Sequence, residues 1–504
     1  YKKLIEGRLM NKNNDELFIN NGLKKILDEK IVSFHMPGHK CGKIYDRLKY
    51  TEMLEGLYKT DTTEIPGTDN LHSPEDIIKE SILKAEKVFE SGKTYYLING
   101  STCGIEAAIM ATCNPGEKLI LSRDSHQSAV NACILGDIVP IYVKSEIDKY
   151  TNIQRGNSFE DVKKAIDENE DTKVLFLTYP TYYGITFELE KIISYAHDKE
   201  MVVVIDEAHG AHLGLSEKLP KTALECGADI VIQSTHKTLP AFTQSSMMHI
   251  SKEALKSGRV DTDRIEKMLK MTETSSPSYI LMQSLEIAVD IYEKYGKELM
   301  EELINNINEF KIKIEEINEY TNKTKIKNVD FFKIHNEKDL TKIFISSLEV
   351  GLTGYEFEEI LRKEHNIQVE LSNYSGALMI ATIGNEKEDF EKLENALIEI
   401  YIKSLEEGRK KIEPVDYPYE LIPQMALTPR EAFYSRKKKN VKIEESIGKI
   451  CGENIVPYPP GVCMIAAGEI IPQEIMDYLK YCKKEGMEIT GVKDSRFEYI
   501  QIID

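Results

Sequence analysis

Short apolar runs alternate with helical patterns between residues 76 and 278, and this alternation constrains the fold more than any other feature of the chain. The sequence predicts strands at 94–98, 118–121, 139–143, 174–178, 202–206 and 230–234. It predicts helices at 76–90, 105–112, 159–167 and 188–197. Buried strands that alternate with helices are typical of a mostly parallel sheet covered on both faces. The predicted fold class is therefore α/β.

The pattern changes after residue 278, which predicts further domains. A long helical stretch covers 279–308 and continues over 310–318, and strands at 343–348 and 377–383 then flank a helix at 354–365. Proline and tyrosine mark a boundary around 413–423. With 504 residues the chain can form two or three domains. We expect an N-terminal arm with interface loops (1–75), a large domain (76–278), a long helix with a small α+β domain (279–412) and a C-terminal domain (413–504).

Lys237 follows a predicted apolar strand, in the sequence Ser234-Thr-His-Lys237. Ligands of parallel α/β sheets bind beyond the carboxyl ends of the strands, so this amine is delivered to the expected binding edge. Burial would lower the pKa of the amine and allow it to form a Schiff base with an aldehyde. The residue therefore indicates pyridoxal 5'-phosphate (PLP), with a surface lysine that begins a helix as the ordinary alternative.

Upstream residues could supply the other groups of a PLP site. Asp206 ends the strand at 202–206 and could face the pyridine nitrogen, where its charge would keep the ring an electron sink, or it could cap the next helix. Ala208 is small enough to fit beneath the ring. His126 could stack on the outer face of the ring, although an ordinary loop histidine is the commoner case. His209 could also bind the cofactor, although its sequence position alone gives weaker support for this role.

A turn of small residues, Asn99-Gly-Ser-Thr-Cys-Gly104, precedes a predicted helix and could bind the phosphate. Backbone N–H groups at a helix start favour anions, and Ser101 and Thr102 add hydroxyl donors beside Cys103. His236 could also donate to the phosphate, close to Ser234. An ordinary strand-to-helix turn would look similar, and no Gly-Lys-Ser/Thr sequence of a P-loop follows.

Composition excludes several classes of function. The 65 basic and 84 acidic residues give a net charge of −19, which argues against a nucleic-acid surface. No apolar stretch approaches the ~20 residues of a membrane span, and the first residues lack the apolar core of a secretory signal. The eight cysteines lack C-x-x-C pairs and zinc spacing, which favours a cytoplasmic location and disfavours a metal site.

Taken together, the ordered motifs resemble those of the bacterial Orn/Lys/Arg decarboxylases, PLP enzymes of fold type I. The resemblance rests on Phe34-His-Met-Pro-Gly-His-Lys40, Asp69-Asn-Leu-His72, Asp206-Glu-Ala-His209, Ser234-Thr-His-Lys237 with Gln244-Ser-Ser246, Leu427-Thr-Pro-Arg-Glu-Ala-Phe-Tyr434 and Tyr458-Pro-Pro-Gly461. It is strongest to the shorter Gram-positive type of arginine decarboxylase, because only residues 1–33 precede the first motif and leave no room for a wing domain.

The resemblance implies a fold-type-I, transferase-like large domain and a role for each site residue. Lys237 would be the Schiff-base lysine, Asp206 the partner of the pyridinium and His126 the stacking group. The phosphate would lie among Ser101, Thr102, Ser234 and His236. Family members are dimers or multiples of dimers with sites at the subunit interface, so the loop from His35 to Lys40 would complete a partner's site. Tyr458 and Glu469 would lie near the substrate, with Glu469 a candidate reader of its distal cation.

The function implied is PLP-dependent decarboxylation of a basic L-amino acid, giving CO2 and an amine of polyamine biosynthesis. Arginine, to agmatine, is favoured over lysine and ornithine. The alternatives are another fold-type-I reaction, such as that of an aminotransferase or lyase, and a non-catalytic PLP-binding regulatory protein. Aminotransferases typically keep a carboxylate-binding arginine in the small domain. Here Arg362 is the one arginine between residues 330 and 400, and it falls within a predicted helix.

Three residues depart from the pattern of the family. Asn70 replaces an aspartate, which removes a negative charge near a possible cation-binding region. Cys463 and Ala467 replace prolines close to Gly468-Glu469, and the resulting looser loop could alter substrate choice.

Overall fold

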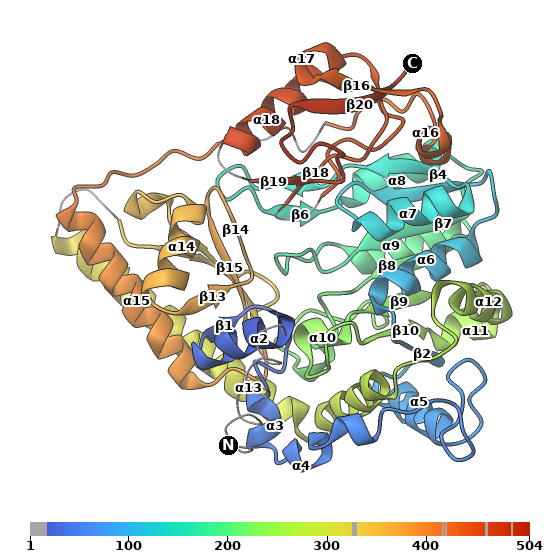
Figure 1. Ribbon diagram of the computed structural model, residues 1–504, viewed down its shortest axis with the longest axis horizontal. Helices are drawn as coiled ribbons and strands as arrows, with labels where there is room; N and C mark the ends of the chain where they lie inside the picture. Colours follow the sequence, from blue (N-terminus) through green and yellow to red (C-terminus); the bar gives the residue numbers. More distant parts are fainter. Residues whose placement is uncertain (1–17, 325–329, 416–417, 419–420, 459–461, 485–486) are drawn as a thin grey trace, which may run out of the picture.

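A seven-stranded sheet forms the centre of the molecule in a computed structural model, which describes residues 18–324, 330–415, 418, 421–458, 462–484 and 487–504 (Figure 1). The strand order is β2-β10-β9-β8-β7-β3-β4. β10 is antiparallel to both of its neighbours, whereas the other neighbouring strands run parallel. The strands are β2 (Lys93–Leu97), β3 (Lys118–Ser122), β4 (Val139–Val143), β7 (Val174–Thr178), β8 (Val202–Asp206), β9 (Ile230–Gln233) and β10 (Ser246–Ile250). The predicted α/β fold with a mostly parallel sheet is confirmed.

Both faces of this sheet are buried, because successive side chains of a strand point to opposite faces. In β7, Leu175 and Leu177 pack into one hydrophobic cluster, while Val174 and Phe176 pack into another. The helices of this part of the chain are α5 (Ile77–Val88), α6 (Gly100–Thr112), α7 (Gln127–Gly136), α8 (Phe159–Glu168), α9 (Leu189–Asp198), α10 (Thr235–Thr238), α11 (Lys252–Ser257) and α12 (Thr262–Thr272), with the 3-10 helix η2 (Leu213–Leu215). Covering helices explain why the strands read as continuous apolar runs.

A second, antiparallel sheet follows the long helix α13 (Tyr279–Thr324), which is continuous across the two predicted helical segments. Its strand order is β11-β12-β15-β14. The elements are β11 (Lys333–His335), β12 (Lys342–Ser346), β14 (Leu371–Asn373) and β15 (Gly376–Ile380), with η3 (Leu348–Val350), α14 (Gly354–Glu364) and α15 (Lys387–Glu406). The predicted α+β pattern of this region is therefore present.

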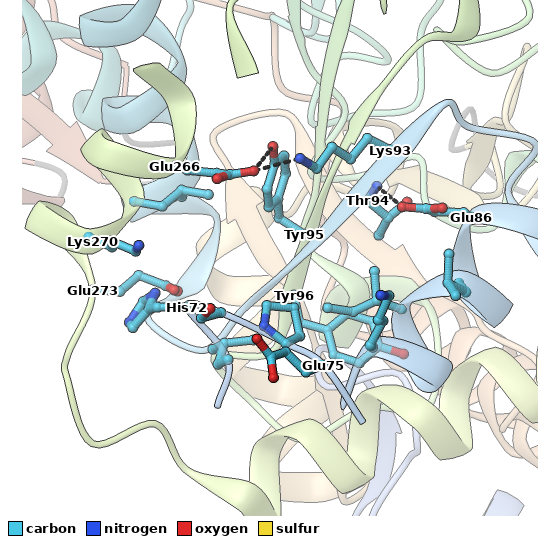
Figure 2. A pocket seen from close by; sticks show the side chains of 17 residues that line it. His72, Glu75, Glu86, Lys93, Thr94, Tyr95, Tyr96, Glu266, Lys270 and Glu273 are labelled. Atoms are coloured by element: carbon cyan, nitrogen blue, oxygen red, sulfur yellow. Dashed lines mark hydrogen bonds and ion pairs between the residues drawn. The ribbon is translucent and has the colours of Figure 1, made fainter. Parts of the chain in front are cut away.

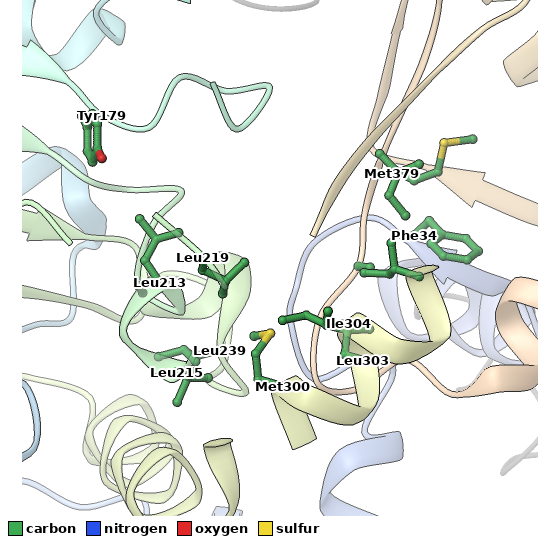
Figure 3. Close-up of a cluster of buried hydrophobic side chains, with 14 of the residues drawn as sticks. Phe34, Tyr179, Leu213, Leu215, Leu219, Leu239, Met300, Leu303, Ile304 and Met379 are labelled. Atoms are coloured by element: carbon green, nitrogen blue, oxygen red, sulfur yellow. The ribbon is translucent and has the colours of Figure 1, made fainter. Parts of the chain in front are cut away.

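The two sheets share one hydrophobic core. Figure 3 shows Met300, Leu303 and Ile304 of α13 between two groups of buried side chains. Leu213, Leu215, Leu219 and Leu239 lie on the side of the large sheet, and Phe34 and Met379 lie on the side of the small sheet. The core therefore fixes both sheets relative to each other.

The region from 18 to 75, predicted as an arm with interface loops, holds several short elements. Helices α2 (Phe18–Asp28), α3 (Lys43–Arg47) and α4 (Thr51–Leu54) and the 3-10 helix η1 (Leu57–Lys59) are present. β1 (Val32–Phe34) pairs in parallel with β13 (Ile367–Val369). This pairing joins the start of the described chain to the small sheet.

The C-terminal part packs beside β4 and α7, at the top of Figure 1. It contains a sheet of order β16-β20-β17 and the pair β18-β19. The elements are α16 (Pro429–Tyr434), β16 (Lys438–Lys442), α17 (Ile443–Ser446), β17 (Ile450–Cys451), β18 (Val456–Tyr458), α18 (Gln473–Lys484), β19 (Glu488–Thr490) and β20 (Tyr499–Ile503); the hairpin β5 (Glu146–Ile147) and β6 (Gln154–Gly156) belongs to the large domain. The domain boundaries given from the sequence remain predictions.

Candidate active site

A cavity of about 250 Å³ lies at the carboxyl ends of the parallel strands. Nine predicted cofactor-binding residues line it together: Ser101, Thr102, His126, Asp206, Ala208, His209, Ser234, His236 and Lys237. They come from the ends of β2, β3, β8 and β9, where the chain leaves the sheet and enters a helix or turn. The prediction that a tenth residue, Cys103, contacts the cofactor is corrected. Cys103 is buried and is not among the lining residues, and its Sγ donates to the Gly100 carbonyl at 3.0 Å.

Lys237 and His209 contact each other in this cavity. Lys237 lies in α10, directly after β9, and its Nζ is 3.0 Å from Nε2 of His209. Burial lowers the pKa of Lys237, and the nearby Asp206 charge opposes that shift. Burial, with the charge of Lys237, also lowers the pKa of His209 well below its usual value. Both side chains are therefore biased toward neutrality, and a neutral amine is the nucleophilic form of lysine.

Asp206 is placed to accept a cationic partner. It is the last residue of β8, only 2% exposed, and its Oδ1 accepts the N–H of Ala208 at 3.0 Å. Burial raises the pKa of Asp206, with the Lys237 charge opposing the shift. A buried carboxylate of this kind is stabilised by a protonated nitrogen placed against it. The small Ala208 leaves room for a flat ring beside it.

The turn before α6 makes an anion site. Gly100, the first residue of α6, has a φ of 79°, a conformation that favours glycine. Ser101 follows, and its Oγ accepts the hydroxyl of Ser234 at 2.7 Å. His236 is oriented by a contact of 3.0 Å between its Nδ1 and the Ser245 carbonyl. Free N–H groups at the start of a 13-residue helix, with hydroxyls around them, fit a phosphate.

His126 caps α7 and presents an exposed ring to the cavity. Its Nδ1 accepts the N–H of Ser128 at 3.2 Å, which fixes the ring at the start of the helix. His126 is exposed, and it lines the cavity. An imidazole that lines the same cavity as Ala208 and Asp206 is suited to stacking on a planar ring.

Orphaned polar atoms give an independent test of whether the cavity fits PLP. Among the described residues, Thr178 Oγ1 and His209 Nδ1 are buried and have no hydrogen-bond partner, and both residues line the cavity. Buried polar atoms normally have partners, so these two indicate a polar ligand or water. The amine, the carboxylate, the anion-binding turn and the orphaned donors together fit an aldehyde, a pyridine nitrogen and a phosphate on one molecule.

Eight lining residues were not among the predicted cofactor-binding residues: Gly100, Ile105, Asp124, Gln154, Thr178, Thr181, Tyr182 and Val462. Thr178 ends β7, so the strand-end rule that selected Asp206 also pointed to its position. The ring centroid of Tyr182 lies 4.2 Å from that of His209. Val462 comes from the C-terminal part of the chain, and no local pattern connects it with a site more than 200 residues upstream.

Two of the predicted substrate residues, His35 and Glu469, are not among the residues that line this cavity. His35 does not line the cavity, and its backbone carbonyl accepts Nζ of Lys40 at 2.7 Å. Tyr458 ends β18, and its side chain lies outside the described residues, as do residues 459–461 of the same motif. Glu469 is 1% exposed, and both of its carboxylate oxygens accept hydrogen bonds from Arg123. The expectation that Glu469 reads a substrate cation is therefore corrected, because its charge is already matched.

A larger cavity, of about 580 Å³, lies beside the edge strand β2 and contains none of the predicted cofactor residues (Figure 2). Two of its acidic side chains accept hydrogen bonds from the protein. Glu266 accepts Nζ of Lys93 at 2.5 Å, and Glu86 accepts the N–H of Thr94 at 3.0 Å (Figure 2). The chemistry described above therefore belongs to the smaller cavity.

Fold and site together define a PLP-dependent enzyme of fold type I. Residues 18–389 match the family model "Orn/Lys/Arg decarboxylase, major domain", and residues 415–495 match "Orn/Lys/Arg decarboxylase, C-terminal domain". The chain belongs to the Orn/Lys/Arg decarboxylase family, and it is a PLP-dependent decarboxylase of a basic amino acid.

Relatives and solved structures agree with this assignment. The chain is 34% identical to the arginine decarboxylase of Bacillus subtilis over 483 residues, 96% of each chain. It is 32% identical to the arginine decarboxylase of Bacillus anthracis over 475 residues, 94% of each chain. Its fold is similar to the lysine decarboxylase of Francisella novicida, with a TM-score of 0.74, 21% identity, and coverage of 94% of this chain and 79% of that one. Within the described residues, no helix combines the length and apolar character that crossing a membrane requires.

Proposed function

We propose that this decarboxylase acts on arginine, releasing CO2 and agmatine into polyamine biosynthesis, with lysine and ornithine as the alternatives. The observation that carries the reaction is the cavity in which Lys237, Asp206 and His126 lie together. The choice of arginine is supported by the Bacillus relatives named above, which carry the name arginine decarboxylase over nearly the whole length of the chain.

Lys237 would hold the cofactor covalently through its aldehyde carbon. The residue is suited to this role because burial lowers the pKa of its amine, so that the neutral, nucleophilic form is accessible. His209 orients the amine through the contact of 3.0 Å. Ser101, Thr102, Ser234 and His236 would surround the phosphate.

When bound, PLP supplies an electron sink for the electron pair that the departing CO2 leaves at Cα. Asp206 would hold the proton on the pyridine nitrogen, because its short, buried carboxylate has one fixed position at the end of β8. His126 would hold the ring flat from the other side. The Cα bond that stands perpendicular to this fixed ring plane overlaps the π system, so loss of the carboxylate rather than of a proton requires the substrate carboxylate to be held out of that plane.

Decarboxylation replaces the carboxylate at Cα with hydrogen, so each turnover takes up one proton. Lys237 and His209 are the candidate donors, and the 3.0 Å between their nitrogens lets one resupply the other. The lowered pKa of His209 means that it passes a proton on rather than retaining it at neutral pH.

The test is product analysis with PLP-loaded protein and arginine, lysine or ornithine supplied separately. Strongly preferred release of CO2 and agmatine from arginine would support the proposal, whereas preference for lysine or ornithine would overturn the choice of substrate. Absence of CO2 from all three, with cofactor absorbance present, would favour another fold-type-I reaction or a regulatory role.

The assembly is proposed to be a homodimer or a multiple of dimers. Helix α2 supports this, because Ile19, Leu23, Ile26 and Leu27 recur at helical spacing and are all more than half exposed. Such an apolar stripe is normally covered, and a second copy of the chain is the partner that the family resemblance implies. Light scattering coupled to size exclusion would measure the mass in solution, and a monomer would contradict the proposal. A cytoplasmic location is also proposed, from the scattered cysteines in the sequence.

A further inference from the structure

A buried ion pair joins the C-terminal domain to the edge of the cofactor cavity. Arg123 is 6% exposed and Glu469 is 1% exposed. Nη1 of Arg123 donates to Oε1 of Glu469 at 2.7 Å, and Nη2 donates to Oε2 at 2.8 Å. This is the bidentate geometry in which a guanidinium and a carboxylate fix each other's orientation.

Neighbouring groups hold both partners in place. Nη2 of Arg123 also donates to the carbonyl of Met464 at 2.8 Å, and its guanidinium carbon lies 4.5 Å from the ring centroid of Tyr142. Oε2 of Glu469 also accepts the N–H of Ala466 at 2.7 Å. The pair therefore organises the segment from Met464 to Glu469, and its two charges compensate each other inside the protein.

Arg123 stands in the turn that carries two residues of the cofactor cavity. It follows β3 directly, and its N–H donates to the Val143 carbonyl at 2.8 Å. Asp124 and His126, one and three residues later, line the cavity, and so does Val462 of the C-terminal segment. The ion pair thus lies between two walls of one cavity that are more than 300 residues apart in the chain.

We propose that Arg123 and Glu469 are positioning residues that set the turn carrying His126 against the C-terminal segment carrying Val462. The proposal rests on the role of His126 in binding the cofactor. It gives the carboxylate at position 469 a role inside the protein, because that carboxylate matches the charge of the buried guanidinium. Breaking the pair would let the turn and the segment move independently, which would loosen the ring of the bound cofactor.

The test compares Arg123→Lys and Glu469→Gln with a matched control, Arg430→Lys. Arg430 also joins the C-terminal domain to the large domain, since its Nη1 donates to the carbonyls of Ile134 at 2.8 Å and Leu135 at 2.9 Å. It does not line the cavity. Tyr142→Phe is a second control, because the Tyr142 hydroxyl has no hydrogen-bond partner among the described residues, so this change preserves the ring beside Arg123.

Two readouts do not depend on turnover: the dissociation constant of PLP from the apoprotein and the visible circular dichroism of the bound cofactor. Arg123→Lys keeps the charge but loses the planar fork, and we expect PLP binding to weaken about tenfold, which equals about 1.4 kcal/mol. The circular dichroism should change in both pair variants, with kcat lowered more than KM is raised. Both control variants should bind PLP as the unmodified protein does.

Arg123→Lys tests the proposal even where Glu469→Gln leaves the protein too unstable to study. Folded Arg123→Lys protein with unchanged PLP affinity and circular dichroism would overturn it. Equal losses of PLP affinity in Arg123→Lys and Arg430→Lys would also overturn it, because they would show that any contact between the two domains has the same effect. Failure of arginine as the substrate leaves both cofactor readouts intact, so the two proposals fail independently.

Discussion

Replacing Gly100 by alanine tests whether the left-handed conformation of the turn before α6 is needed for PLP binding or only for the stability of the fold. Gly100 has a φ of 79°, and a Cβ atom built there meets nothing nearer than the Gln244 carbonyl oxygen at 3.9 Å. Alanine therefore causes no collision, and its cost is that of the left-handed conformation, about 1–2 kcal/mol. If the turn keeps this conformation in the apoprotein, the whole cost appears as a lower free energy of unfolding. If the turn relaxes instead, it must return to this conformation when PLP binds, and the cost appears as weaker PLP binding.

A thermodynamic cycle relates the loss of stability of the apoprotein to the loss of PLP affinity and fixes their sum. The loss in the free energy of unfolding of the apoprotein and the loss in PLP binding free energy should together amount to about 1–2 kcal/mol. If the turn relaxes completely, PLP binding weakens roughly 5- to 30-fold. Urea denaturation of the apoprotein and titration with PLP measure the two parts.

Gly116→Ala is the matched control. Gly116 has a φ of 84°, and a Cβ atom there meets nothing within 4 Å, but the residue is not among those that line the cavity. It should lose the same 1–2 kcal/mol of stability, with PLP affinity unchanged. The reasoning is refuted if Gly100→Ala alters neither quantity, or if it weakens PLP binding by far more than the conformational cost allows.

Further expected outcomes concern the reactive and buried side chains. Lys237→Ala should abolish both turnover and the visible absorbance of bound cofactor, and full activity in this variant would remove Lys237 from its proposed role. Asp206→Ala should keep some PLP but lose about a hundredfold or more in kcat, because a fixed charge beside the pyridine nitrogen is lost, and an unchanged rate would contradict that role. Burial lowers the pKa of His249 from 6.5 to about 3. The unfolded chain therefore binds more protons than the folded protein between these values, and the free energy of unfolding should fall as pH falls below about 6.5, by up to about 1.4 kcal/mol per pH unit. Urea denaturation at pH 7 and pH 5 would measure this fall, and it should be smaller in His249→Gln; an equal fall would contradict the assignment.

The grouping of these side chains in one cavity could be predicted because the residues follow local rules. Asp206 ends an apolar strand and Lys237 lies four positions after the end of another, and parallel strands deliver their carboxyl ends to one edge of the sheet. The same rule extends to Thr178, which ends β7 and lines the cavity. No knowledge of distant contacts was needed to bring these three together.

Other parts could not be predicted because their signals are weak or distant. β10, with the sequence Ser246-Met-Met-His-Ile250, lacks a run of β-branched residues, and its two neighbours in the sheet impose the strand. Cys103 sits one position after two cavity residues, but the turn of α6 directs its thiol into the core. Val462 reaches the cavity only because the C-terminal domain docks there.

Glu469 shows why residue type alone gave the wrong role. An acidic residue near the end of a decarboxylase for cationic substrates suggests recognition of that cation, yet Arg123 lies 346 positions away in sequence and 2.7 Å away in space. A buried guanidinium cannot lose its proton, so it demands a carboxylate wherever it is enclosed. An apolar contact would tolerate sliding of the C-terminal segment, whereas a bidentate pair allows one register. The charge at position 469 is therefore fixed by the assembly of the cavity, and the residue that reads the distal cation must be sought elsewhere.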